Sequence, residues 1–525
     1  MRRTSTVGLC VVLVMVLSGT SVAQGPPRRR GGTAEQVLKR NVDLLLKSQE
    51  KDGHWSHNYN LGMTALAVLA LKHSNDPRAA TAVARGADYL AQAKTEYKVY
   101  SAGTTISALY QIDPRVHRRT IDKYARLLIK SQLVGHEKGM FGYPLVGDPA
   151  RSRHPGLGRG DNSNTQFGVL GLLFAQRAGH QVPSRVWKNV KHHYTSTQNA
   201  DGGWGYRVKN ASGHNMTLAG AVSLYIAEEQ LALAKTTGRC QMAPPSRGTE
   251  AAMKWVGRKF TPELTTYGLY ALERLGILTG RSEFSGHYWY REGAKRLLSG
   301  GGGLQTIGGS DANAAFIILF LSRGKEPIII NKLKYYGDWN NCNYDVKHMT
   351  EYISDKMQSP MQWRIVTLES KLEDLLKVPI LHLNGVKGPQ FSDNEKIKLR
   401  EYVLKGGVIM AQACRVERGL AEFDENFRAL VAECFPEGEL EAVSKTHLMF
   451  KNPRRVTSPP KVEVLKIEGR IAVVYIDKSL TLDWHRGGSG SKASFDAGVN
   501  IVFYLLKQSG RLGAGAKPIR DAKRR

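Results

Sequence analysis

The chain has 525 residues, of which 42% are hydrophobic, and a formal net charge of +29. This length leaves room for two or more domains with sizeable cores, and the basic charge favours anionic partners or serves solubility. The five cysteines are too sparse and irregular for a disulfide framework or a C-x-x-C metal site. Composition therefore excludes those two classes, and we expect neither a metal nor a cofactor.

Residues 1–23 have the layout of a secretory signal peptide. Two arginines precede an apolar core at residues 7–17, and Ser21-Val22-Ala23 forms a small-residue cleavage site. A membrane anchor is the alternative, but it needs about 20 apolar residues and this core is shorter. We therefore expect export to the periplasm or the extracellular space, where polysaccharides or envelope components are better anionic partners than nucleic acid. Residues 24–33 read as a basic linker, and no stretch of the mature chain predicts a transmembrane helix.

A short motif recurs in the first three-fifths of the chain. Residues 49–55 read QEKDGHW, residues 198–206 read QNADGGWGY, and residues 132–143 end in the diverged copy GMFGY. In each full copy the glutamine closes a helix, Asp-Gly forms a tight turn that tolerates positive φ, and the aromatic ring packs back over the turn. The motif is thus expected to brace neighbouring helices, and its residues are Gln49, Asp52, Gly53, Trp55, Gln198, Asp201, Gly202 and Trp204.

The segments that follow each copy are also related. LGMTALAVLAL at 61–71 and HNMTLAGAVSLYI at 214–226 share Met-Thr at the start of a small-residue apolar run, and DNSNTQFGVLGLLFA at 161–175 has the same layout. Repeats of this kind indicate stacked copies of one structural unit. The three copies resemble the repeats of terpenoid cyclases and protein prenyltransferases, of the squalene-hopene cyclase type with its Q-x-x-D-G-x-W motif. This resemblance implies an α/α toroid.

Between residues 34 and 324 two kinds of helical segment alternate. Six segments have one apolar face and are expected to form an outer ring: 34–48, 78–93, 117–131, 184–197, 247–260 and 287–299. Six others are apolar on nearly every side and are expected to be buried: 61–72, 103–111, 164–178, 215–229, 264–275 and 311–323. Twelve alternating helices independently predict a closed α/α (six-hairpin) toroid.

Polar residues begin the buried segments and are expected to face one mouth of the toroid. One explanation is that they are N-caps, which satisfy the free N–H groups of a helix start. The other is a pocket of hydroxyls and amides for a glycan or another polar ligand, and residues 161–166 (DNSNTQ) hold more polar groups than capping requires. The candidate ligand-binding residues are Thr64, Asn162, Asn164, Thr165, Gln166, Asn215 and Thr217.

The chemistry of the resembled families is not fully present. Triterpene cyclases use a D-x-D-D acid motif, which this sequence lacks, and the prenyltransferase zinc site needs Asp, Cys and His, whereas only Cys240 is available in the toroid. We therefore expect a scaffold without that chemistry, with a degenerate terpenoid cyclase-like enzyme as one alternative. A glycosidase or polysaccharide lyase is another, and its candidate carboxylates are Asp161 and Asp311.

After residues 322–327 the periodicity changes. Short apolar runs at 328–333, 364–368, 379–383, 408–413 and 471–476 alternate with helical stretches at 344–357, 392–404, 422–433 and 493–507. Such alternation predicts a parallel sheet covered on both faces. Residues 391–413 resemble class I glutamine-amidotransferase-like domains, and residues 325–508 as a whole resemble a bacterial domain of unknown function with a flavodoxin-like three-layer architecture. Residues 509–525 form a basic tail that reads as disordered.

The amidotransferase resemblance points to one possible nucleophile. Cys414 stands seven positions after Gly407, where those enzymes carry a catalytic cysteine, but the glycines of a nucleophile elbow are missing. His447 is a candidate base, although it lacks the Glu at i+2 of that family's triad. A buried cysteine at the end of a strand is the alternative. Tyr336 and Trp339 follow the first strand, where flavodoxin-like folds bind ligands, and they are candidate ligand-binding residues unless they pack against the sheet edge.

Together these patterns predict an exported, non-catalytic binding or scaffold protein. The expected ligand is a polar or anionic carbohydrate or an envelope component, and the expected surface is the toroid mouth. The rival from another class is an envelope hydrolase or polysaccharide lyase that uses Asp161 or Cys414.

Overall fold

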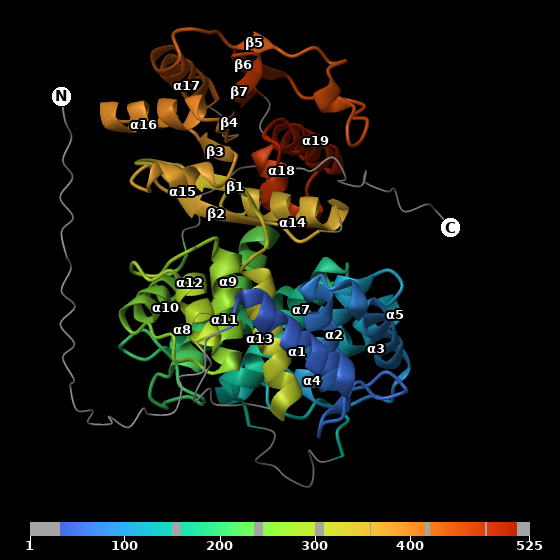
Figure 1. Ribbon diagram of the computed structural model, residues 1–525. Coiled ribbons are helices and arrows are strands. Elements are labelled where there is room, and N and C mark those ends of the chain that lie inside the picture. Colours follow the sequence, from blue (N-terminus) through green and yellow to red (C-terminus); the bar gives the residue numbers. More distant parts are fainter. Residues whose placement is uncertain are drawn as a thin grey trace, which may run out of the picture.

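The computed structural model describes residues 32–149, 159–235, 245–299, 309–357, 359–414, 420–477 and 480–511. The expected signal peptide (1–23), most of the basic linker and nearly all of the basic tail lie outside these ranges. Figure 1 shows the described chain as a helical part, which ends near residue 323, and an α/β part stacked on it.

The N-terminal part is helix-rich, and each of the twelve expected segments is a helix. The helices with one buried face are α1 (Ala34–Ser48), α3 (Ala80–Gln92), α5 (Arg118–Ser131), α8 (Ser184–Ser196), α10 (Arg247–Arg258) and α12 (Trp289–Leu298). The largely buried helices are α2 (Asn60–Ser74), α4 (Val99–Ile112), α7 (Asn162–Arg177), α9 (His214–Lys235), α11 (Thr266–Thr279) and α13 (Gly309–Arg323). Two short 3-10 turns, η1 (Pro77–Ala79) and η2 (Gly135–Glu137), join them.

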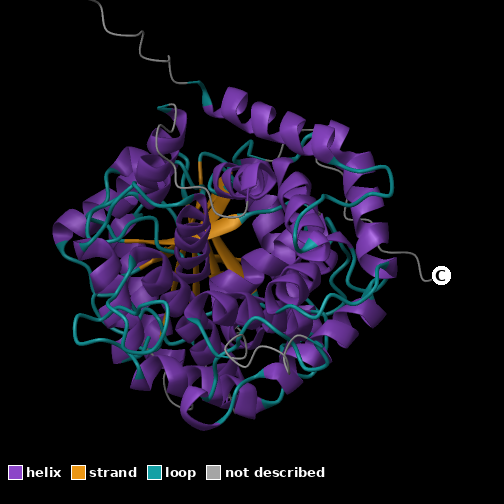
Figure 2. Cartoon of the chain, turned by 90° about the horizontal axis from the view of Figure 1, so that it is seen from below, coloured by secondary structure: helices purple, strands orange, loops and turns teal. Residues whose placement is uncertain are grey.

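The buried helices pack against one another in sequence order. Helix α2 packs against α4, α4 against α7, α7 against α9, α9 against α11, α11 against α13, and α13 against α2, so the contacts return to their start. The amphipathic helices pack around this set, for example α8 and α10 on α9 (Figure 2). Glycines allow the closest approach: a Cβ on Gly103 of α4 would lie 2.2 Å from the carbonyl oxygen of Phe167 in α7.

The repeated motif ties each turn to the helices around it. The side-chain amide of Gln49 donates to the carbonyls of Gly53 and Ala82, both at 2.9 Å, and Gln198 makes the equivalent pair of bonds at 2.8 Å. Gly53 has a φ of 97° and Gly202 a φ of 94°, in the left-handed region that favours glycine.

The aromatic residue of each copy is held by its backbone. The N–H groups of Trp55, Phe141 and Trp204 donate to the hydroxyls of Thr64, Thr165 and Thr217 at 3.0, 3.0 and 3.1 Å. The indole N–H groups of Trp55 and Trp204 donate to the carbonyls of Leu45 and Tyr194, each ten residues earlier. The copies of the motif thus share hydrogen bonds as well as sequence.

The C-terminal part is a seven-stranded sheet between two layers of helices. The strands are β1 (Ile328–Leu333), β2 (Gln362–Val366), β3 (Ile380–Gly385), β4 (Val408–Ala413), β5 (Glu441–Ala442), β6 (Val462–Ile467) and β7 (Arg470–Ile476). The helices are α14 (Asp345–Met357), α15 (Leu372–Leu376), α16 (Asp393–Leu404), α17 (Leu420–Cys434), α18 (Thr481–Arg486) and α19 (Lys492–Gln508), with 3-10 turns η4 (Leu448–Phe450) and η5 (Gly487–Ser489). Helices α14, α18 and α19 share a core with one face of the sheet, and α15, α16 and α17 with the other.

The sheet is mixed, and the prediction of a purely parallel sheet was wrong. The strand order is β2-β1-β3-β4-β7-β6-β5, with parallel pairing from β2 to β7 and antiparallel pairing of β6 with β7 and β5 with β6. Glu468 and Gly469 turn the chain between β6 and β7 with φ values of 51° and 77°, which is typical of a two-residue hairpin. The hairpin therefore places β6 antiparallel beside β7, and β5 pairs with β6 at the outer edge.

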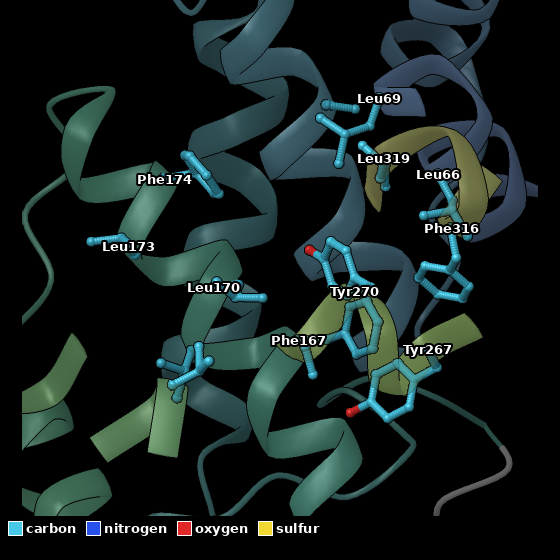
Figure 3. Packing of buried hydrophobic residues seen from close by; sticks show 14 of the residues in the cluster. Leu66, Leu69, Phe167, Leu170, Leu173, Phe174, Tyr267, Tyr270, Phe316 and Leu319 are labelled. Atoms are coloured by element: carbon cyan, nitrogen blue, oxygen red, sulfur yellow. The ribbon is translucent and has the colours of Figure 1, made fainter. Parts of the chain in front are cut away.

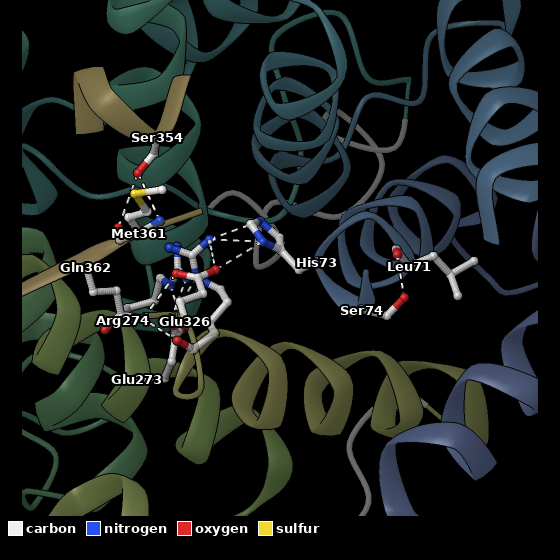
Figure 4. A network of polar contacts seen from close by, with 10 residues as sticks. Leu71, His73, Ser74, Glu273, Arg274, Glu326, Ser354, Met361 and Gln362 are labelled. Carbon is white, nitrogen blue, oxygen red and sulfur yellow. Dashed lines mark hydrogen bonds and ion pairs between the residues drawn. The ribbon is translucent and has the colours of Figure 1, made fainter. Parts of the chain in front are cut away.

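Buried ion pairs join the helical part to the α/β part. Glu229 of α9 contacts the ammonium group of Lys347 and lies 3.0 Å from His348 Nε2, and all three side chains are buried. A second network joins Arg323 and Glu273 to Glu326, with His73 beside it (Figure 4). Charges withdrawn from water in this way stabilise a structure only while all partners are present.

Candidate functional site

A cavity of about 700 Å³ lies among the starts of the buried helices in the N-terminal part. Seven aromatic side chains line it: Tyr59, Tyr100, Tyr143, Phe167, Tyr206, Tyr267 and Phe316. Polar groups interrupt them, from His57, Thr104, Ser163, His214, Asn215, Glu263 and Thr265. Figure 3 shows Phe167, Tyr267 and Phe316 from three different helices turned toward one another. Concave, mainly apolar sites with a few placed polar groups are typical of ligand binding.

Hydrogen bonds hold the cavity's tyrosine rings in place. The Tyr100 hydroxyl donates to Ser163 Oγ at 2.6 Å, the Tyr267 hydroxyl donates to Gln166 Oε1 at 2.5 Å, and the hydroxyls of Tyr143 and Tyr206 lie 3.1 Å apart. Burial raises the pKa of the Tyr100 hydroxyl well above its usual value, so this group is a neutral donor. These bonds orient the tyrosine rings of the cavity wall.

Several predicted binding residues lie outside the lining of this cavity. Three threonines are fully buried: Thr64, Thr165 and Thr217. Their hydroxyls accept the backbone N–H groups of the repeated motif, so these hydroxyls are already used inside the fold. The side chain of Asn162 also has its hydrogen-bond partners within the protein. Its amide donates to the Gly205 carbonyl at 2.8 Å, and its oxygen lies 2.9 Å from His193 Nε2. Asn162 and Thr217 therefore support the loop that carries Tyr206.

The other predicted amides differ in their access to the cavity. Asn164 donates to Asp161 at 2.8 Å, and its own oxygen is buried without a hydrogen-bond partner among the described residues. Gln166 accepts from Tyr267 and so positions a wall residue. Asn215 lines the cavity, where its amide also donates to Thr265 Oγ1 at 3.1 Å.

The two candidate carboxylates have separate surroundings. Asp161 is the N-cap of α7, where one oxygen accepts from the Asn164 N–H and the other from its side chain, each at 2.8 Å, and burial raises the pKa of this carboxyl. Burial also raises the pKa of Asp311, which the Ser48 hydroxyl opposes. Within the described residues no contact joins Asp161 to Asp311, and neither lines the cavity.

Cys414 and His447 are not brought together. Cys414 is fully buried at the end of β4, with its sulfur 3.6 Å from that of Cys342 and 3.6 Å from the Asn384 amide. Burial raises the pKa of this thiol to about 12, which keeps it protonated near neutral pH. The His447 ring instead accepts from the Met449 N–H and packs beside Tyr504.

The loop after β1 holds the other two predicted binding residues. Tyr336 is 92% exposed, whereas Trp339 is half-buried against the core of the α/β part. The loop is fixed by Asp338, which accepts from the Lys387 N–H at 3.2 Å and also from that of Val386, and by the Tyr335 hydroxyl, which donates to a β3 carbonyl. Trp339 is thus held at the carboxyl edge of the sheet.

The aromatic side chains that line the cavity were not among the binding residues predicted from the sequence. A usable signal exists, because Phe141-Gly142-Tyr143 and Trp204-Gly205-Tyr206 place a tyrosine at the same offset in two copies of the motif. Their hydroxyls meet in the structure. Within the described ranges no cluster of three or more side chains could hold a metal ion, and no described helix is long and apolar enough to cross a membrane.

Comparisons with known proteins add little beyond the C-terminal part. The structure is similar to a crystal structure of a protein from Actinoplanes, at 13% identity and a TM-score of 0.35, over 55% of this chain and 98% of that one. No curated protein matches the sequence. Residues 329–506, which include all of the sheet except the first residue of β1, match the family model of a domain of unknown function, DUF4159.

Proposed function

We propose that the protein is an exported carbohydrate-binding protein whose helical part holds a neutral or weakly charged sugar chain in the aromatic cavity. The supporting observation is that five tyrosines line one cavity of about 700 Å³ together with hydroxyl and amide groups. Aromatic faces pack against the C–H faces of sugar rings, while tyrosine hydroxyls bond to sugar hydroxyls. The described lining contains no lysine and no arginine, which favours a ligand with little negative charge.

The architecture that carries the cavity is also part of the proposal. We assign residues 34–324 to an α/α toroid, which the return of the helix contacts from α13 to α2 supports. We assign residues 325–508 to a flavodoxin-like domain, because β2-β1-β3-β4-β7 reproduces the 2-1-3-4-5 order of that fold with a hairpin added before its last strand. In a toroid the helix starts converge at one mouth, where the cavity lies.

Export is supported by the signal-like residues 1–23 and by one further observation. Cys342 is disulfide-bonded. Disulfides persist in oxidising compartments such as the periplasm or the extracellular space. An envelope glycan is therefore an accessible ligand.

Catalysis is less well supported than binding. A glycosidase needs two carboxyl groups about 5 to 9.5 Å apart across the sugar bond. Among the described residues that line the cavity, Glu263 is the single carboxylate; it is 62% exposed and pairs with Arg296 at 2.6 Å. A hydrolase or lyase would have to recruit Asp161 from beneath the wall, and product release from a bound glycan would reveal it.

The test is a glycan array probed with the purified protein, followed by titration of the best ligand. Tyr206→Phe removes one hydroxyl from the cavity, and we expect affinity to fall about three- to tenfold, the value of one hydrogen bond. Tyr288→Phe is the matched control, because Tyr288 is 49% exposed and lies outside the cavity. Equal affinity of both variants, or no glycan bound, would contradict the proposal.

An apolar ligand is the most informative comparison in the same experiment. Met63, Leu66 and Phe316 give the cavity an apolar side, which an isoprenoid chain would also fill. Binding of an isoprenoid hydrocarbon but of no sugar would assign the cavity to the ligand class of the resembled cyclases instead. Tyr206→Phe separates the two ligands as well, because a hydrocarbon gains nothing from a hydroxyl.

A further inference from the structure

We propose a second binding site for an anionic sugar chain, in the cleft between the helical part and the α/β part. The cleft has a volume of about 680 Å³. Lys188 and Lys191 of α8 lie on one wall, and Lys334, Trp339 and Asn340 from the loop after β1 lie on the other. This site is separate from the aromatic cavity and goes beyond the function proposed for it.

The cleft carries an excess of positive charge. Of the described residues that line it, four are cationic, Lys188, Lys191, Arg281 and Lys334, and two are acidic, Glu228 and Glu250. Arg281 pairs with Glu250 at 2.9 Å, and Lys191 lies 3.9 Å from Glu228. In the described parts of the chain no ion pair engages Lys188 or Lys334, and both are exposed. These two ammonium groups, on opposite walls, can contact an anion without breaking an existing pair.

Aromatic and amide side chains lie beside these cations. Trp339 and Tyr344 come from the loop after β1, and Tyr225 faces them from α9, with its ring 6.2 Å from that of Tyr344. Flat aromatic faces next to amides and ammonium groups suit a sugar ring that bears a charged substituent. A ligand with rings and anionic groups in alternation matches this lining.

The loop is positioned before any ligand arrives. The Lys334 N–H donates to the Val366 carbonyl at 2.8 Å, which fixes the backbone next to the free ammonium group. Asp338 and Tyr335 tie the rest of the loop to the end of β3. β1 lies between β2 and β3, so the loop leaves the sheet where the strand order reverses, the usual ligand position in parallel sheets. Little ordering entropy would be lost on binding.

The lining favours a sugar polymer over a nucleotide. Nucleotide phosphates are commonly held by backbone N–H groups of a glycine-rich turn or a helix start. Among the described residues that line this cleft there is no glycine, and the positive charges stand at the tips of separate long side chains. Such spacing matches carboxylate or phosphate groups distributed along a chain.

The test is a titration of the full protein with an oligogalacturonate, which carries one carboxylate per sugar. Lys188→Gln combined with Lys334→Gln should weaken binding about tenfold at low ionic strength, and the difference should shrink as salt is added. The matched control combines Lys254→Gln with Lys405→Gln, because both lysines are exposed, have no ion pair among the described residues and lie outside the cleft. A phosphorylated oligosaccharide in a parallel titration distinguishes the two anionic groups.

Each outcome bears on the site. Tighter binding of either charged sugar by the native protein than by the lysine pair variant, with the control unchanged, supports the proposal. Equal loss in both pairs would show a general charge effect and overturn it, as would binding of a single-stranded oligonucleotide in place of both sugars. Tyr206→Phe should leave the charged-sugar affinity unchanged, so failure of the aromatic cavity and failure of this cleft are distinguishable.

Discussion

Replacing Thr217 by valine removes a hydrogen-bond acceptor from the repeated motif without changing the shape of the side chain. Thr217 is fully buried, and its hydroxyl accepts from the Trp204 N–H at 3.1 Å. The tryptophan is 1% exposed, so water cannot replace the lost acceptor. A buried N–H left without a partner costs about 1 to 3 kcal/mol, and we expect the free energy of unfolding to fall by about 2 kcal/mol.

The assay is urea unfolding followed by tryptophan fluorescence, with Thr195→Val as the control. Thr195 is exposed and its hydroxyl bonds only to carbonyls of its own helix, so its loss should change stability by about 0.5 kcal/mol or less. Thr64→Val, which has the same bond to Trp55, should repeat the Thr217 result. If the Thr217 and Thr195 variants unfold at the same urea concentration, the hydrogen bond of Thr217 does not stabilise the motif. That result would contradict a stabilising role for the hydrogen bonds that the repeats share.

Three further predictions follow from buried ionisable groups. Glu229→Leu should destabilise the protein by about 3 to 5 kcal/mol in denaturant unfolding, because Lys347 is left buried and unpaired. Adding Lys347→Met should recover most of the lost stability. No recovery in the double variant would contradict the pairing. Burial opposes ionisation of Asp345, but the ammonium group of Lys332 helps to lower the pKa of this carboxyl to about 2. The carboxylate therefore stabilises the fold above about pH 4. The free energy of unfolding, measured between pH 4 and 2, should fall less steeply in Asp345→Asn than in the native protein. Cys414 should resist alkylation by iodoacetamide in the native protein and react after unfolding, and rapid native labelling would contradict its burial and its raised pKa.

The sequence predicted the helices of the N-terminal part well because the two helix classes differ along their whole length. Buried helices such as α4 are apolar on every side, whereas amphipathic helices such as α5 alternate every three or four residues. In the C-terminal part the central strands are short, mainly apolar runs and were equally clear. The strands β5 and β6 were missed because β5 is two residues long and β6 carries charged residues between apolar ones.

The site was harder to predict, because sequence position does not tell whether a polar group is free. Thr165 and Asn162 looked like ligand contacts, but the loops packed over them use their bonding capacity. Tyr100 and Tyr267 lie within apolar segments, where a ring usually belongs to the core, and no sequence pattern distinguishes them as residues that line a cavity. Glu228 and Glu229 interrupt the apolar run of their segment, and Glu229 takes part in the contact between the two parts.

Oxidative footprinting of tyrosines with and without the bound glycan tests the central claim most directly. Tyr206 is 37% exposed and lines the aromatic cavity, so a sugar chain bound there should protect it, while Tyr336 and Tyr288, which lie outside the cavity, should react at an unchanged rate. Protection of Tyr336 or Tyr288 with Tyr206 unchanged would place the ligand elsewhere and contradict the aromatic cavity as its site.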